Sequence, residues 1–187
     1  MRLEEAITSR RSVGRLTAPA PSDAELHDIV ALAMTAPDHG RLSPWRVIPL
    51  RGASRETLGE RFAEAALDGE PAARERAARK PLRAPLLLTL VFSPVPDHAK
   101  VPEWEQLAAA VCAVHTMTLL LHARGWGSIW RTGAVVTDPG VHALLGLRKH
   151  EQLLGWLYVG TPDARHAPVP RPAGRPEDKL RPFAPGR

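Results

Sequence analysis

Three short segments of this 187-residue chain bring together residue types that bind anions and flat aromatic ligands. The first is Arg10-Arg11-Ser12, where two guanidinium groups stand beside a hydroxyl. A guanidinium can grip phosphate oxygens with two hydrogen bonds, and a serine hydroxyl can add a short one. The same cations could instead stabilise the carboxyl end of the preceding helix. The segment is therefore a candidate phosphate site or a helix-end cation cluster.

The second and third segments are polar and contain tryptophan. Residues 36–45 (Ala-Pro-Asp-His-Gly-Arg-Leu-Ser-Pro-Trp) follow a predicted helix, and residues 127–133 (Gly-Ser-Ile-Trp-Arg-Thr-Gly) place an aromatic ring, a cation and a hydroxyl between glycines. An ordinary helix-to-strand connection would explain the former, and a strand with one exposed face would explain the latter. Neither segment specifies a function by itself.

Several common catalytic signatures are absent from the sequence. It has no Gly-x-Ser-x-Gly nucleophile elbow, no Walker phosphate loop and no Gly-x-Gly-x-x-Gly after a strand. Cys112 lies among alanines and is predicted to be a small core residue rather than a nucleophile. His115 and His122 share a helical face, but no carboxylate accompanies them at ligand spacing, so we expect no metal site.

Charge and composition narrow the classes of partner. The net charge is +5, of which residues 163–187 contribute +3, so the remaining body is nearly neutral and we expect no nucleic-acid partner. The longest uncharged stretch, residues 107–121, is too short for a membrane span, and the N-terminus lacks the apolar run of a signal peptide. With a single cysteine, these features predict a cytoplasmic protein without a membrane partner.

The hydrophobic pattern predicts an α+β fold with three or four strands and helices on both sides. Ser22 and Glu25 form a capping box at the start of one helix, and Ser54 is expected to cap another whose inner face carries Leu58, Phe62 and Ala65. Helices are predicted at 3–9, from 22 to before Pro37, after 54, at 71–80, at 102–123 and after 138. Strands are predicted at 45–50, 86–92, 128–132 and 153–159, with 86–92 buried and central.

The predicted helix 102–123 is apolar around nearly its whole circumference between Ala108 and Val114. Such a helix must be covered on all sides. A second copy of the chain would cover it, and so would a central position within one domain; composition alone does not separate the two.

Taken together, the order and spacing of four elements resemble the nitroreductase family, particularly its short-chain branch, from about Leu3 to Pro162. These elements are Arg10-Arg11-Ser12; Ala36-Pro37-Asp38-His39 with Pro44-Trp45; Lys100-Val101-Pro102-x-Trp104-Glu105-Gln106; and Gly127-x-Ile129-Trp130-Arg131-x-Gly133 ahead of Leu157-Tyr158-x-Gly160-Thr161-Pro162.

The resemblance implies a nitroreductase-like homodimer with a central mixed or antiparallel sheet, a long central helix and an extended C-terminal arm. Residues 1–162 would form the FMN-binding domain, and the proline- and arginine-rich residues 163–187 would form the arm. Arg10 and Ser12 would hold the FMN phosphate, while Thr35 and His39 would arrive from the partner. The implied cofactor-binding set is Arg10, Arg11, Ser12, Thr35, His39, Trp130, Arg131, Thr132 and Gly133.

The implied activity is transfer of hydride from NADH or NADPH to FMN and then to a nitroaromatic or quinone-like acceptor, by a ping-pong mechanism. FMN carries this chemistry, so no catalytic side chain is required. Arg131 is the first candidate to stabilise negative charge on the reduced ring, and Arg15 is the second. The alternatives are a different flavin reaction, such as dehalogenation or dehydrogenation, and a flavin-binding or regulatory protein without efficient turnover.

Two departures from the family pattern concern the flavin contacts. Arg41 and Ser43 stand where many members have asparagine and glutamine. Gly14 stands where the family has a basic residue, and Arg15 follows one position later.

Overall fold

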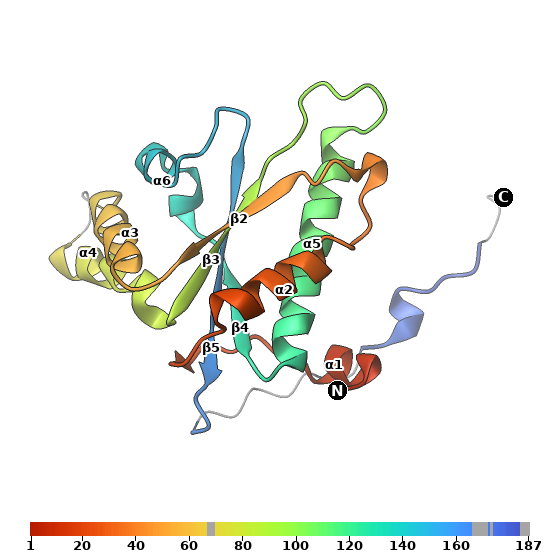
Figure 1. Cartoon of the computed structure of the whole chain (residues 1–187), viewed down its shortest axis with the longest axis horizontal. Helices are drawn as coiled ribbons and strands as arrows, with labels where there is room; N and C mark the ends of the chain where they lie inside the picture. Colours follow the sequence, from red (N-terminus) through yellow and green to blue (C-terminus); the bar gives the residue numbers. More distant parts are fainter. Residues whose placement is uncertain (67–69, 166–171, 173, 184–187) are drawn as a thin grey trace.

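The computed structural model describes residues 1–66, 70–165, 172 and 174–183. A five-stranded sheet runs through its centre, and every strand pair in it is antiparallel (Figure 1). The strands are β1 (Leu16–Thr17), β2 (Trp45–Leu50), β3 (Leu86–Phe92), β4 (Gly127–Arg131) and β5 (Gln152–Pro162). β5 pairs with β3, β4 and β1, and β2 forms one edge beside β3. The sheet is thus antiparallel, within the mixed or antiparallel expectation.

Helices cover both faces of the sheet, as the sequence predicts (Figure 1). One layer contains α2 (Asp23–Ala33) and α5 (Glu103–Ala123), and the other contains α3 (Ala53–Glu64), α4 (Pro71–Ala78) and α6 (Pro139–Leu144). The helix α1 (Leu3–Ser9) contacts α5. Short 3-10 turns are η1 (His39–Arg41), η2 (Lys80–Arg83), η3 (Ala134–Thr137) and η4 (Pro176–Asp178).

All seven residues of β3 are buried, which confirms the predicted central strand. Alternate side chains enter the two cores because successive strand residues point to opposite faces. Leu86, Leu88 and Leu90 join the core formed with α2 and α5, whereas Leu87 joins the core formed with α3, α4 and α6.

Two helix starts form where the sequence predicts them. The Ser22 hydroxyl accepts from the Glu25 amide at 3.2 Å, and the Glu25 carboxylate accepts from the Ser22 amide at 2.9 Å, which completes the capping box. Asp138 accepts from the Val141 amide at 2.8 Å and begins α6. These side chains satisfy amides that have no partner within the helix.

The predicted start of α3 is wrong by two residues. Gly52, with φ +49°, takes the capping position, and the Ser54 hydroxyl instead donates to the Arg51 carbonyl oxygen at 2.7 Å. Leu58 and Phe62 are buried as expected, but Ala65 is exposed because it lies just beyond the last helical residue.

The expected strand bounds also differ from those observed. β4 begins one residue before 128 and ends one before 132, and β5 extends on both sides of 153–159. The two-residue strand β1 was not predicted because a segment this short carries no alternating pattern.

The long helix α5 buries one face and leaves another open. Ala110, Ala113 and Met117 are completely buried, whereas Val111 is 40% exposed. Cys112 is exposed too, so its predicted core position is wrong: it lies on the uncovered face of the helix. By length and composition alone α5 could cross a membrane. Its contacts with the sheet and α2 account for the apolar character of the buried face.

Part of the predicted C-terminal arm, residues 166–171, 173 and 184–187, lies outside the described residues. The described part includes η4, and its largest apolar side chains, Leu180 and Phe183, are 80% and 90% exposed.

Candidate functional site: the free edge of β4

The segment Arg10-Arg11-Ser12 lies beside the outer edge of β4. It follows α1 directly, Ser12 forms a bridge with Ser128, and the Val13 amide donates to the Ser128 carbonyl oxygen at 2.9 Å. Beyond this bridge, β4 pairs only with β5 among the described residues. The outer backbone groups of β4 from Ile129 onward therefore form a free strand edge, which can pair with a ligand.

A cavity of about 290 Å³ lies on the α5 side of this edge. Its lining combines the segment after α1, the uncovered face of α5 and β4: Arg10, Ser12, Val111, His115, Thr118, Ser128, Ile129 and Trp130. The cation and hydroxyls suit a phosphate, and the apolar side chains and the tryptophan suit the carbon skeleton of a ligand.

Arg10 and Arg11 have different positions in this segment. Arg10 lines the cavity. The Arg11 guanidinium donates to the carbonyl oxygens of Thr8 and Arg10 at 2.7 and 2.9 Å, so Arg11 holds the end of α1. The helix-end interpretation therefore describes Arg11, while the position of Arg10 favours the anion-site interpretation.

The pKa of His122 is sensitive to the positive charges near the C-terminal end of α5. Its Nε2 atom lies 2.7 Å from the Ser9 hydroxyl. Burial lowers the pKa of His122, and the charges of Arg10 and Arg11 lower it further. A neutral imidazole leaves the two arginines as the local cations, and such a region attracts anions.

Trp130 and Arg131 project to opposite faces of the sheet, because they are successive residues of one strand. The Trp130 indole packs against the core formed by α2 and α5 and donates to the Leu154 carbonyl oxygen at 2.8 Å. The Arg131 guanidinium lies 5.7 Å from the centre of the Tyr158 ring, which belongs to the other core. The two predicted site residues therefore flank the β4 edge from different sides.

Two further cavities lie on the Arg131 side, with volumes of about 400 and 670 Å³. The smaller is lined by Thr132 and Gly133 with Lys80, and the larger by Arg15; both share Arg83 and Arg131. Lys80 and Arg83 were not among the predicted site residues. Their only sequence signal is the basic turn Arg79-Lys80-Pro81-Leu82-Arg83, which resembles an ordinary solvent-exposed segment.

Arg131 is the most enclosed cation of these two cavities. Its Nε atom is buried and has no hydrogen-bond partner among the described residues. Burial raises the pKa of Tyr158, while the positive charges of Arg131 and Arg83 partly oppose this shift. The phenol therefore remains neutral at physiological pH.

Thr35 and His39 do not join these cavities. The Thr35 hydroxyl donates to the Leu32 carbonyl oxygen at 2.8 Å, and His39 Nδ1 lies 2.7 Å from Glu105 Oε2 at the start of α5. The cavity that Arg10 lines lies farther along α5, and His122 lies near the C-terminal end of this helix. At 1.5 Å per residue, Glu105 and His122 are about 25 Å apart along the helix.

The loop that carries His39 holds strained backbone. Arg41 and Ser43 adopt φ values of +52° and +46°, which side-chain-bearing residues rarely take. The Asp38 carboxylate accepts from the Ser43 amide at 2.7 Å and fixes the turn. Loops that retain such strain often lie at binding sites.

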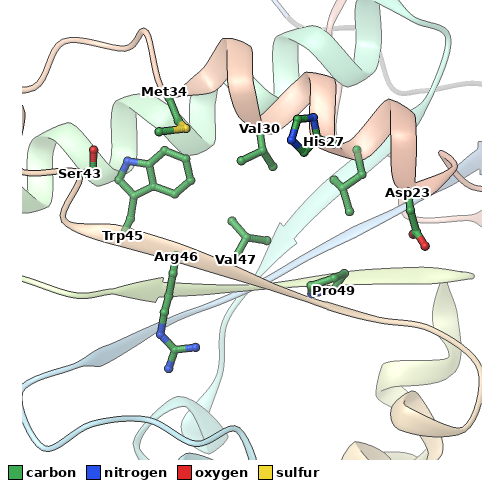
Figure 2. Close-up of a pocket in the computed structure, with 10 residues that line it drawn as sticks. Asp23, His27, Val30, Met34, Ser43, Trp45, Arg46, Val47 and Pro49 are labelled. Carbon is green, nitrogen blue, oxygen red and sulfur yellow. The ribbon is translucent and has the colours of Figure 1, made fainter.

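The apolar groove in Figure 2 lies at the opposite edge of the sheet, between α2 and β2. Leu26, His27, Val30, Met34 and Trp45 are among its lining residues, which include none of the predicted cofactor residues. For metals, no group of three or more histidine, cysteine, aspartate or glutamate side chains converges within the described ranges.

Comparison with known proteins identifies the family. The nitroreductase family model matches residues 7–161. YdjA of Escherichia coli strain K12, which is named for an inferred NAD(P)H nitroreductase activity, is 37% identical over 163 residues, covering 86% of this chain and 88% of YdjA.

Solved structures share the fold. A nitroreductase-like protein from Bacillus cereus superposes with a TM-score of 0.86 at 23% identity, over 98% of this chain and 96% of its own. A Bacteroides fragilis nitroreductase with bound FMN has a TM-score of 0.75 at 20% identity, over 98% of this chain and 100% of its own. The chain belongs to the nitroreductase family, which is a family of oxidoreductases.

Proposed function

We propose that this protein is an FMN-dependent oxidoreductase that takes hydride from NADH or NADPH and reduces nitroaromatic or quinone-like acceptors. The observation that carries the proposal is the Arg10–Ser12 cavity beside the free edge of β4. A relative with 37% identity is named for NAD(P)H nitroreductase activity, and a structural neighbour contains FMN.

The residues at this edge fit FMN chemically. Arg10 and Ser12 supply charge-assisted and hydroxyl hydrogen bonds for the terminal phosphate. Trp130 lies in β4 and Thr132 and Gly133 follow it, so their backbone amide and carbonyl groups would contact the polar edge of the flavin ring. Arg11 contributes by holding the end of α1.

Arg131 supplies the electrostatic part of the mechanism. FMN held at this edge would supply the hydride chemistry that links the nicotinamide to the oxidant. The half-buried Arg131 guanidinium, held over the Tyr158 ring, would stabilise negative charge beside it without first reorganising, and this would favour the reduced cofactor. Because one group serves both substrates, we expect them to bind in turn, as in a ping-pong mechanism.

We also propose that the enzyme is a cytoplasmic homodimer whose two sites are shared. The exposed face of α5, with Val111 and Cys112, is available for a second copy. His39 contacts Glu105 at the opposite end of α5 from His122, and both Thr35 and His39 would come to the site from the partner. In this proposal residues 1–162 form the FMN-binding domain and 163–187 form an arm.

The experiment is identification of the cofactor followed by steady-state kinetics. Acid or heat should release FMN from the yellow purified protein, and NAD(P)H oxidation with a nitroaromatic or quinone should give parallel double-reciprocal lines. A colourless protein that does not take up added FMN would contradict the proposal. Intersecting lines would contradict the ping-pong mechanism alone, and bound FMN without turnover would favour a regulatory role.

A further inference from the structure

Four cations from three segments line the two cavities on the Arg131 side of β4. Arg15 follows the Arg10–Ser12 segment, Lys80 and Arg83 lie in η2, and Arg131 ends β4. We call this pair of cavities the basic cleft. Residues far apart in the sequence thus place their charges around one space.

Among the described lining residues of the basic cleft, cations outnumber carboxylates by four to one. Asp163 is the carboxylate among the lining residues, and Arg165 binds it at 2.9 Å. Across the part of the chain that the structure describes, no ion pair joins Arg15, Lys80, Arg83 or Arg131 to a carboxylate. Like charges that face one cavity repel one another, and an anion bound between them relieves this repulsion.

The FMN phosphate of the proposed function does not fill this role. Arg10 lies in the cavity on the α5 side of β4, whereas Lys80 and Arg83 lie on the side of Tyr158. Arg131 and Thr132 border both the β4 edge and the basic cleft. A ligand of the cleft would therefore lie beside the proposed cofactor while its anionic group contacts other cations.

We infer that the basic cleft binds an oxyanion carried by a substrate of the enzyme, either the oxidant or the nicotinamide reductant. Arg83 and Arg15 are the residues that recognise it. This inference rests on the proposed function. A carboxylate on the oxidant and a phosphate of the nicotinamide reductant have the same recognition chemistry. Guanidinium groups bind either one with paired hydrogen bonds.

The test uses the purified holoprotein, Arg83→Ala, the double variant Arg15→Ala/Arg83→Ala and the control Arg76→Ala. Arg76 is an exposed cation of α4 that does not line the cleft, so the control removes the same charge from a neighbouring segment. Calorimetry measures binding of benzoate and benzamide, which differ in charge and do not react. Kinetics compare 4-nitrobenzoate with 4-nitrobenzamide, and NADPH with NADH.

We expect Arg83→Ala to weaken benzoate or NADPH selectively by about tenfold, which is the loss of one charge-assisted contact. The double variant should lose more, while Arg76→Ala and benzamide binding stay unchanged. Loss of the benzoate and 4-nitrobenzoate preference identifies the oxidant as the source of the oxyanion, and loss of the NADPH preference identifies the reductant.

Equal losses for charged and neutral ligands, or no loss for any of them, would overturn the inference. Turnover of 4-nitrobenzamide tests the proposed function separately. Holoprotein that turns over 4-nitrobenzamide but shows no charge preference contradicts only the basic cleft. Protein without flavin turnover contradicts the proposed function, and benzoate calorimetry still decides whether the cleft binds an oxyanion.

Discussion

Single residues in this protein hold charge in two distinct settings. At the β4 edge, Arg10 and Arg131 line cavities and can act on a ligand. Arg46 and Glu151 form an ion pair within the fold: the Arg46 guanidinium donates to both Glu151 carboxylate oxygens, at 2.8 and 2.7 Å. Paired cations build the fold, whereas the cations of the basic cleft remain available for binding.

The Arg46–Glu151 pair gives a stability prediction. Glu151 is fully buried and also accepts from the Arg148 amide, and the Arg46 hydrogen bonds are the main reason that its pKa falls from 4.5 to about 2. Glu151→Gln should lower the free energy of unfolding at pH 7 by up to about 3 kcal/mol.

Urea denaturation across pH checks this effect. A lowered pKa stabilises the fold above pH 4.5, and the contribution disappears as the pH falls toward 2, so the wild-type and variant curves should converge there. Glu75→Gln, which removes an exposed partner of Arg79, should cost less than about 1 kcal/mol. A pH-independent difference for Glu151→Gln would refute the assignment.

At the scale of elements, β4 positions the site because it is a strand with one free edge between two helical layers. β5 fixes its other edge, from Gly127 opposite Gly160 to Arg131 opposite Trp156. Gly155 lies in β5, one residue before the partner of Arg131, and has a φ of +104°. A Cβ atom at this position would meet the Arg131 carbonyl oxygen. The position of Arg131 and Thr132 therefore depends on a glycine in the neighbouring strand.

Gly155→Ala should displace the end of β4. We expect a loss of about 2 kcal/mol in unfolding free energy and at least a tenfold weaker affinity for FMN. The control is Gly146→Ala: Gly146 also has a positive φ, but its Cβ would meet no atom within 4 Å. Fluorescence titration with FMN distinguishes them, and equal FMN affinities in the two variants would show that Gly155 does not position the site.

The sequence predicts elements whose causes are local. The capping box at Ser22 and the seven-residue apolar run of β3 are properties of neighbouring residues, and both form as expected. The placement of Ser54 fails because Gly52 competes for the capping position. Lys80 and Arg83 line a cavity with Arg131 only because the fold brings η2 close to β4. A local sequence pattern does not predict this tertiary contact.

For the whole molecule, the length of α5 separates the two groups of predicted site residues. His39 contacts Glu105 near the start of the helix. Near its end, the charges of Arg10 and Arg11 help to lower the pKa of His122. The helical rise places these ends about 25 Å apart. Residues at opposite ends of one helix can meet at one site when two copies pack in opposite directions across their exposed α5 faces.

Mixed dimers test this arrangement. Arg10→Ala and His39→Glu should each inactivate the homodimer, but refolding them together should restore about a quarter of normal activity. Half of the dimers are then mixed, and each mixed dimer has one site with both residues intact. Confirmed heterodimers without recovered activity would mean that both residues act within one chain.

In the proposed site Arg10 holds the phosphate of FMN at the free edge of β4, and a comparison of two flavins measures this contact. Apoprotein is titrated with FMN and with riboflavin, which lacks the phosphate, in wild type and Arg10→Ala. We expect Arg10→Ala to weaken the binding of FMN by about 1.5–3 kcal/mol and to leave the binding of riboflavin unchanged. Unaltered FMN affinity, or an equal loss for both flavins, would contradict it.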